Sequence, residues 1–284
     1  MSKVEPAHEY RSASSVQKFQ ENIAAVRARM DAAAARVGRS PDEVRLLPVS
    51  KTVPEHRIRA AVEAGLDRLA ENKVQEATRK CRNLADLDVE WSIVGHLQTN
   101  KARDVAAYAA EFQALDSLRV ADALERRLQA AGRGLDVFVQ VNTSAEPQKY
   151  GVAPEELPEF LRALAGHETL RVRGLMTLAV FSPDTERVRT CFSLLRRLRD
   201  EARDTDPDLI GPGELSMGMS GDFETAIEEG ATVVRVGQAI FGARSTPDSH
   251  YWPGATPDTA TPDAATPDTA TPAGESAAEE EKNT

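Results

Sequence analysis

A lysine ends an apolar stretch near the start of the chain, and its amine is the first group suited to chemistry. In "RLLPVSKTVPE", residues from Leu46 to Ser50 are typical of a strand buried on both faces, and Lys51 follows directly. An amine at the mouth of a barrel or an open sheet can condense with an aldehyde to form a Schiff base. A lysine whose stem packs while its ammonium stays in water explains the same stretch. The strand alone leaves both interpretations open.

An arginine interrupts the last apolar strand of the chain. Arg235 stands in "VVRVG" two positions before Gly237, so both residues share one face of the strand. A buried guanidinium is costly unless something compensates it. If Lys51 carries an aldehyde cofactor, Arg235 can face a ring nitrogen, and arginine is a known partner of the pyridine nitrogen of pyridoxal phosphate. A buried ion pair with Asp116 or Glu71 is the alternative.

The segment before this strand predicts an anion site. Ser220 and Gly221 are expected to open a helix that closes at Gly230, and Gly237 and Gln238 are expected to end the eighth strand. Free backbone N–H groups at such places bind phosphate, and barrels commonly hold a phosphate after strands seven and eight. Ser220 as a simple helix cap needs no ligand.

Two acids follow Ser220 at the start of the same predicted helix. Asp222 and Glu224 lie in its first turn, and their negative charges oppose a bound phosphate unless they point outward. The anion site is therefore expected only with these side chains turned away.

The elements that must position these residues alternate regularly along the chain. A helix is predicted over 16–37, where apolar residues recur three and four positions apart. Further helices are predicted over 54–65, 72–85, 97–109, 117–131, 154–166, 184–204 and 221–230. Eight short apolar runs separate them, from the strand before Lys51 to "VVRVGQAIFG". A (β/α)8 barrel is the predicted fold, with a doubly wound open sheet as the alternative.

The barrel predicts that functional residues lie at the carboxyl ends of its strands. Polar side chains and glycines are prominent at these positions around one lysine: Lys51, Glu71, Asn72, Gly95, His96, Asp116, Ser117, Asn142, Thr143, Ser144, Met176, Thr177, Ser220 and Gly237. His96 has no evident partner in the sequence.

Length and composition fit an ordinary soluble protein with one large domain or two small ones. The chain has 284 residues, of which 41% are hydrophobic and 28% charged. No apolar run is long enough for a membrane helix and the start lacks a secretion signal, so we expect a cytoplasmic protein without membrane contact. Cys81 and Cys191 lack the spacing of a disulfide framework or zinc site and are expected to be packing residues.

The charge is concentrated in the last part of the chain. The net charge is −10, and residues 246–284 carry eight carboxylates against one lysine. The remainder has no basic stripe interleaved with aromatics, so no nucleic-acid partner is expected. We predict a flexible N-terminus over 1–14, a cofactor-binding barrel over 15–245, and a disordered, acidic Thr-Pro-rich tail over 246–284.

Six motifs in order resemble the pyridoxal phosphate homeostasis proteins, whose barrel is similar to the N-terminal domain of alanine racemase. The resemblance covers about residues 15–244 and rests on "LLPVSKT", "AENKVQE", "IVGHLQTNK", "VQVNTSAEPQKYGV", "RGLMTL" and "LSMGMSGDFETAIEEGATVVRVGQAIFGAR". It implies a Schiff base on Lys51, a phosphate held by Ser220, Gly237 and Gln238, a pyridine nitrogen facing Arg235, and a ring near Asn72 and Met219.

Three positions qualify the resemblance. Ala70 stands where the family usually has glycine, and Gln238 stands where threonine is commoner, so the phosphate affinity depends on whether a threonine hydroxyl normally contributes. Lys149, in "EPQKYG", matches a second family lysine, an alternative acceptor of the aldehyde. A solvated loop lysine is the simpler interpretation.

The resemblance implies a carrier or regulator of intracellular pyridoxal 5′-phosphate rather than an enzyme, with pyridoxal phosphate-dependent apoenzymes as recipients and a monomer or weak dimer as its form. A pyridoxal phosphate-dependent amino acid racemase is the alternative, and it needs a second acid/base group opposite Lys51. No tyrosine of the body falls at a strand end, so this group is not evident, although weak racemase-type activity stays open. A cofactor-free Schiff-base aldolase is a more distant alternative, which would leave Arg235 without a role.

Overall fold

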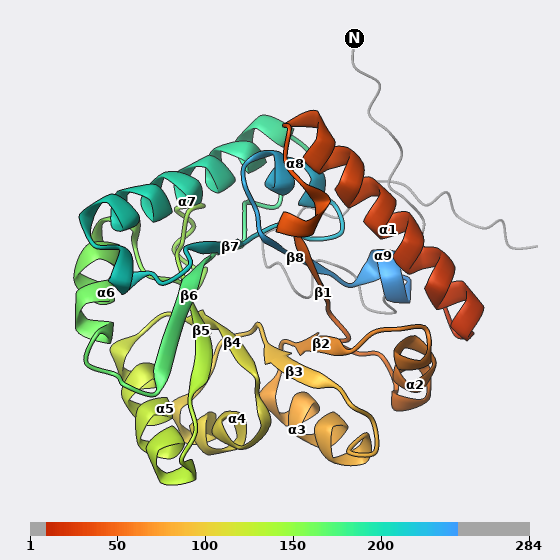
Figure 1. The fold of residues 1–284 in the computed structure, drawn as a ribbon, viewed down its shortest axis with the longest axis horizontal. Coiled ribbons are helices and arrows are strands. Elements are labelled where there is room, and N and C mark those ends of the chain that lie inside the picture. Colours follow the sequence, from red (N-terminus) through yellow and green to blue (C-terminus); the bar gives the residue numbers. More distant parts are fainter. Residues whose placement is uncertain (1–9, 244–284) are drawn as a thin grey trace, which may run out of the picture. The chain divides into compact units, whose positions relative to one another are not determined.

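The computed structural model describes residues 10–243 of the chain. Strands and helices alternate along this part, as Figure 1 shows. The strands are β1 Arg45–Pro48, β2 Arg68–Glu71, β3 Glu90–Ile93, β4 Glu111–Leu115, β5 Leu135–Gln140, β6 Leu170–Met176, β7 Glu214–Ser216 and β8 Val233–Val236. The helices are α1 Val16–Arg36, α2 Glu55–Glu63, α3 Val74–Asn83, α4 Ala102–Tyr108, α5 Leu118–Ala131, α6 Leu157–Leu164, α7 Thr185–Thr205, α8 Phe223–Glu228 and α9 Gln238–Phe241.

The eight strands form one parallel sheet that closes into a barrel. Their order is β1-β8-β7-β6-β5-β4-β3-β2, and a bridge between Val49 and Ala70 joins β1 to β2. The helices lie outside the ring of strands (Figure 1). The predicted (β/α)8 barrel is therefore confirmed. All strand carboxyl ends meet at one rim, which places residues from distant parts of the sequence around one mouth.

Helix α1 packs across the first and last parts of the barrel. Ser15 caps it, because its hydroxyl accepts a hydrogen bond from the backbone N–H of Lys18 at 3.2 Å. Its buried face includes Phe19, whose ring meets Phe241 of α9 edge-on at a centroid distance of 5.7 Å. Burial of this face holds α9, and with it the end of β8, in place.

The chain before α1 also contacts the barrel. Ala13 is fully buried and donates its backbone N–H to Phe241 O at 3.3 Å, and the Tyr10 hydroxyl donates to Ser220 O at 3.1 Å. These contacts concern residues 10–14 of the segment predicted to be flexible, while residues 1–9 lie outside the described residues. The predicted tail over 246–284 lies outside them too. Within residues 10–243, no helix combines the length and apolar character that crossing a membrane requires.

Candidate functional site

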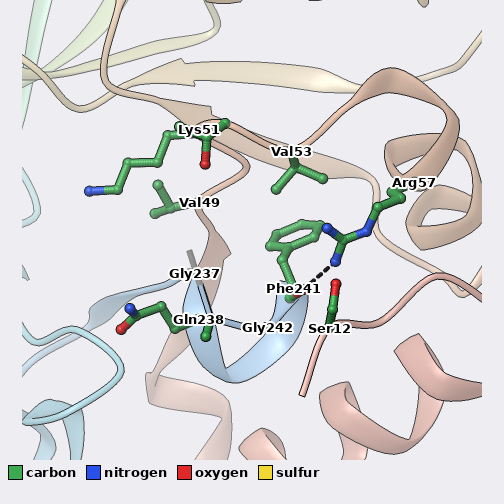
Figure 2. Close-up of a pocket in the computed structure, with 11 residues that line it drawn as sticks. Ser12, Val49, Lys51, Val53, Arg57, Gly237, Gln238, Phe241 and Gly242 are labelled. Carbon is green, nitrogen blue, oxygen red and sulfur yellow. Dashed lines mark hydrogen bonds between the residues drawn. The ribbon is translucent and has the colours of Figure 1, made fainter. Parts of the chain in front are cut away.

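A pocket of about 220 Å³ opens beside the ends of β1 and β8. Three of the seven predicted site residues line it, namely Lys51, Gly237 and Gln238. Figure 2 shows the side chains of Lys51 and Gln238 extending to the same side, away from Arg57. The remaining lining residues are Ser12, Val49, Thr52, Val53, Arg57, Phe241, Gly242 and Ala243. Lys51 and the first residues of α9 therefore line one cavity.

Lys51 stands in a tight turn rather than at the end of a strand. Strand β1 stops at Pro48, and Val53 donates its backbone N–H to Ser50 O at 2.9 Å. Thr52 has a φ of 65°, a left-handed conformation that is strained for a β-branched residue. Its backbone N–H donates to Glu76 Oε1 at 2.9 Å, a contact that holds the strained turn. Lys51 is thus positioned by a turn that Glu76 of α3 holds, in place of the strand end that the sequence predicts.

A buried cluster around Lys80 holds the other side of the same turn. Lys80 in α3 has no exposed side-chain area, and its Nζ lies 2.6 Å from Glu71 Oε1 and 2.8 Å from both Glu76 Oε1 and Ser50 O. Glu71 Oε1 also accepts a hydrogen bond from Ser50 Oγ at 2.7 Å. The Lys80 cluster, consisting of Ser50, Glu71, Glu76 and Lys80, therefore binds the residues on both sides of Lys51.

Burial dominates the electrostatics of the Lys80 cluster. Burial raises the pKa of the Glu71 carboxyl, although the nearby Lys80 ammonium opposes this shift. One oxygen, Glu71 Oε2, is buried without a hydrogen-bond partner in the described part of the chain. Losing the Lys80 ammonium would remove the ion pair of Glu71 and leave its carboxylate buried.

Ser220 forms the centre of an anion-binding geometry, but it is not a helix cap. Its hydroxyl oxygen accepts hydrogen bonds from the backbone N–H groups of Gly237 at 3.3 Å and of Ala239 at 3.4 Å. Helix α8 begins only at Phe223, so the prediction that Ser220 and Gly221 open it is wrong. The reason is that the Met219 N–H donates to the carboxylate of Asp222, which forms a separate turn before the helix.

The two acids after Ser220 have different surroundings. Glu224 Oε1 pairs with Arg29 of α1 at 2.8 Å, so this carboxylate points away from the pocket. Asp222 accepts from the Met219 N–H at 2.5 Å, and burial raises the pKa of its carboxyl. The anion site was expected only if both acids turn away from it, and Glu224 does so. Asp222 instead accepts a hydrogen bond from the backbone within its own turn.

Gly237 and Gln238 begin a helix instead of ending a strand. Strand β8 stops at Val236, Gly237 is the residue before α9, and the backbone N–H groups of Ile240 and Phe241 bond to Gly237 O at 3.0 and 2.9 Å. The eighth strand, expected to end at Gly237 and Gln238, therefore ends earlier, at Val236. A side chain at Gly237 would lie 3.1 Å from Val49 O, so glycine allows β1 and this turn to approach closely.

Arg235 lies inside the barrel and is hydrogen-bonded rather than ion-paired. Its Nη1 donates to Ser216 Oγ at 2.7 Å and its Nη2 to Thr177 O at 2.8 Å. Among residues 10–243 it has no ion pair: Glu71 pairs with Lys80 and Asp116 with His96, so neither suggested partner holds it. Burial lowers the pKa of Arg235 to about 10, which keeps the guanidinium charged at neutral pH.

Asn72 and Met219 lie at the predicted rim but do not line the pocket. Asn72 follows β2, and a side chain at Gly95 would meet its backbone oxygen at 2.0 Å, so the loops after β2 and β3 touch here. Met219 is half-buried in the turn after β7. The structure therefore places the two residues after β2 and β7, which are not adjacent strands, and does not itself bring them to Lys51.

His96 has partners that the sequence does not reveal. Its Nδ1 lies 3.2 Å from Asp116 Oδ2, and its ring stacks on Tyr150 at a centroid distance of 3.9 Å. Lys149 differs from the solvated loop lysine that the sequence favours, because its side chain is only 12% exposed. Its Nζ donates to Ala179 O at 2.9 Å and lies 2.5 Å from Glu146 Oε2.

Several residues that shape the site were missed from the sequence. Lys80 shares the inner face of α3 with Val74 and Ala77, a spacing that could have marked it as buried. Ser216 and the carbonyl of Thr177 hold Arg235, and Arg57 binds the carbonyl oxygens of Ala13 and Phe241. The contacts with the carbonyl oxygens of Thr177, Ala13 and Phe241 leave no signal in residue type. In the described part of the chain, no group of three potential metal ligands occurs.

Comparison with known proteins relates the chain to two groups. Residues 16–245 match the family described as alanine racemase, N-terminal domain. The chain is 44% identical over 224 residues to the pyridoxal phosphate homeostasis protein of Pseudomonas aeruginosa, spanning 79% of this chain and 95% of that one. The corresponding Escherichia coli K12 protein is 42% identical over 226 residues, spanning 78% and 95%.

A solved structure with a ligand is also similar. It is PipY of Synechococcus elongatus PCC7942 with pyridoxal phosphate bound, at 34% identity and a TM-score of 0.70. The similarity covers 79% of this chain and all of the PipY chain, 100%. The likeness therefore includes the whole barrel on which the pocket is built.

Proposed function

The chain belongs to the pyridoxal phosphate homeostasis protein family, and from this we propose that it holds pyridoxal 5′-phosphate reversibly on Lys51. In this role it limits the free aldehyde and passes the cofactor to apoenzymes. The observation that carries the proposal is the meeting of an amine, from Lys51, with the converging N–H groups of Gly237 and Ala239 at one end of the barrel.

The residues around Ser220 suit the phosphate. The backbone N–H groups of Gly237 and Ala239 converge on the hydroxyl oxygen of Ser220, which accepts a hydrogen bond from each. A phosphate oxygen is a stronger acceptor than a hydroxyl, so these N–H groups and the Ser220 O–H can all donate to it. We assign Gln238 to this site through its backbone N–H, because it opens α9. Threonine is then not required at this position.

The residues on the inner side suit the ring. Arg235 uses two of its N–H groups on Ser216 and Thr177, and within the described chain its other N–H groups have no partner. A guanidinium can only donate hydrogen bonds, and a pyridine nitrogen with a free electron pair accepts one. We assign Arg235 to this nitrogen and place Asn72 and Met219 beside the ring.

Lys51 supplies the covalent link. Its neutral amine attacks the aldehyde carbon, a nitrogen–carbon bond forms, and the aldehyde oxygen leaves as water. The Lys80 cluster and the Glu76 contact fix the turn on both sides of Lys51, which limits the directions in which the amine can reach. Water reverses the link, so the protein can release the cofactor unchanged.

The proposal includes no catalytic turnover. Racemisation requires a base on one face of the substrate carbon and an acid on the other. Tyr10 donates to Ser220 O, Tyr150 stacks on His96, and burial raises the pKa of Tyr108 to about 12. None of these three tyrosines lines the pocket that contains Lys51, although Tyr150 is 57% exposed. The His96 and Asp116 pair is the remaining acid/base candidate at the rim.

Titration with pyridoxal 5′-phosphate, followed by visible absorption, tests the proposal. The wild-type protein should develop a Schiff-base band with one equivalent of ligand. Lys51→Ala should lose this band, whereas the matched variant Lys149→Ala should keep it. A band that survives in Lys51→Ala and disappears in Lys149→Ala would contradict the assignment of the cofactor to Lys51.

A further inference from the structure

A chain of buried polar groups runs through the barrel from Arg235 to a glutamate near the opposite end. Arg235 Nη1 donates to Ser216 Oγ at 2.7 Å, Ser216 Oγ donates to Gln113 Oε1 at 2.6 Å, and Gln113 Nε2 donates to Glu111 Oε1 at 2.7 Å. All four side chains are buried, with exposed fractions from 0% to 4%. Glu111 and Gln113 lie two positions apart on β4 and so share its inward face.

The chemistry of the four groups fixes the direction of every hydrogen bond. A guanidinium has no acceptor, so Ser216 must accept from Arg235 and turn its own hydrogen toward Gln113. Gln113 then presents its oxygen to Ser216 and its amide nitrogen to Glu111, a carboxylate that only accepts. Reversing the Gln113 amide would place donors against Ser216 and leave Glu111 without this donor. The carboxylate at the far end therefore sets the orientation of the group that touches Arg235.

Glu111 itself is held in place from two other sides. Ser92 Oγ donates to Glu111 Oε1 at 3.1 Å, and Arg45 Nη2 lies 2.7 Å from Glu111 Oε2. Arg235 has no ion pair within the described chain, and while burial lowers its pKa, the carboxylates of Asp222 and, to a lesser extent, Glu111 raise it. Of these two carboxylates, Glu111 is connected to Arg235 by two neutral groups. A buried charge with such a polarised chain is more stable than one facing unoriented dipoles.

We propose that Glu111 and Gln113 are positioning residues for Arg235, fixing through Ser216 the direction in which its guanidinium donates to the ring nitrogen of bound pyridoxal phosphate. The inference rests on the proposed function, because it assumes that Arg235 faces this nitrogen. It adds two residues of β4 that lie behind Arg235, on its side away from the ligand. Their effect is specific to the ring nitrogen and does not extend to the phosphate or the aldehyde.

Comparing two ligands tests this specificity. The probes are pyridoxal 5′-phosphate and its 1-deaza analogue, in which a C–H group replaces the ring nitrogen. The measured quantity is the ratio of the two dissociation constants. In the wild-type protein the natural ligand should bind more tightly, because Arg235 has an acceptor only there. Gln113→Met should reduce this preference about tenfold, equivalent to about 1.4 kcal/mol. Glu111→Gln should reduce the preference for the natural ligand less, about threefold, because its amide oxygen still accepts the hydrogen bond from Gln113 but carries no charge.

Glu125→Gln is the matched control, because Glu125 is a buried, hydrogen-bonded glutamate of α5 outside this chain of groups. It should leave the preference unchanged. A Gln113→Met protein that folds and keeps the wild-type preference would overturn the proposal, as would an equal loss of affinity for both ligands, which indicates general structural support. If Gln113→Met does not fold, Glu111→Gln decides between the same outcomes. If the wild-type protein binds pyridoxal phosphate and the analogue equally well, this inference and the assignment of Arg235 are wrong, but the proposed function stands. If it binds neither ligand, the proposed function is contradicted as well.

Discussion

Replacing Lys80 by methionine removes the cation of the buried cluster that holds the Lys51 turn. Lys80 and Glu71 both have fully buried side chains, and the 2.6 Å contact between them is the shortest in the cluster. Methionine fills a similar volume but donates no hydrogen bond to Glu71, Glu76 or Ser50 O. The variant therefore removes the donor that the buried Glu71 carboxylate, the half-buried Glu76 carboxylate and the Ser50 carbonyl oxygen share.

The expected loss in free energy of unfolding is large. Breaking a buried ion pair by removing one partner costs about 3–5 kcal/mol. We expect the lower end of this range at neutral pH, because burial raises the pKa of Glu71 and the abandoned carboxylate can take up a proton. A loss of about 3 kcal/mol is still a large fraction of the 5–15 kcal/mol that stabilises a typical domain.

Urea unfolding of the ligand-free protein, followed by circular dichroism, measures this loss. Lys73→Met is the matched control, since Lys73 is an exposed lysine immediately before the same helix, and it should change the unfolding free energy by less than about 0.5 kcal/mol. In the double variant Lys80→Met and Glu71→Leu, part of the loss should be recovered, because apolar residues can replace a buried pair. A loss below about 1 kcal/mol in Lys80→Met would refute the reasoning.

Three further results are expected. Ser220→Ala should weaken binding of pyridoxal 5′-phosphate about tenfold or more, the effect of losing a hydrogen bond to a charged group, with little change for unphosphorylated pyridoxal; equal losses in the two titrations would remove the phosphate from Ser220. Burial raises the pKa of Tyr108 from 10.0 to about 12, so the stability that Tyr108 contributes should be present below pH 10 and be lost as the pH rises toward 12. In Tyr108→Phe, the melting temperature should lack this part of the fall between pH 10 and 12. An identical fall in melting temperature in both proteins would contradict the prediction. Incubation with L-alanine in deuterated water should yield no D-alanine, and its rapid formation, abolished in Lys51→Ala, would favour a racemase.

The sequence predicted the barrel because its strongest signals are local. Short apolar runs alternate with amphipathic helices, and this alternation favours a parallel barrel whatever the loops do. The limits of α1 were predicted to within one residue, since Ser15 caps its start and its apolar face is regular. The end of β8 was wrong because apolar residues continue past the strand into α9 in "VVRVGQAIFG", and apolarity alone does not distinguish a strand from a buried helix. The start of α8 was wrong because Asp222 closes a separate turn before it.

The site was predicted in outline, and its supporting contacts were not. Lys51 and Gly237 could be found because each follows a short apolar run, and the structure places both at one pocket. The partner of His96 could not be found, because Asp116 reaches it from a different strand end only after the barrel closes. The contacts of Arg235 have the same cause, since Ser216 lies on β7 and Thr177 directly follows β6. Such pairings depend on tertiary structure and are not encoded in spacing.

Reduction with borohydride followed by peptide mapping tests the central claim most directly. Borohydride converts the Schiff base between an amine and pyridoxal 5′-phosphate into a stable secondary amine, which marks the lysine involved. After one equivalent of ligand, mass spectrometry should find the pyridoxyl group on the peptide that contains Lys51, with the peptide containing Lys149 largely unmodified. A label found mainly on Lys149, or spread evenly over exposed lysines, would contradict the account.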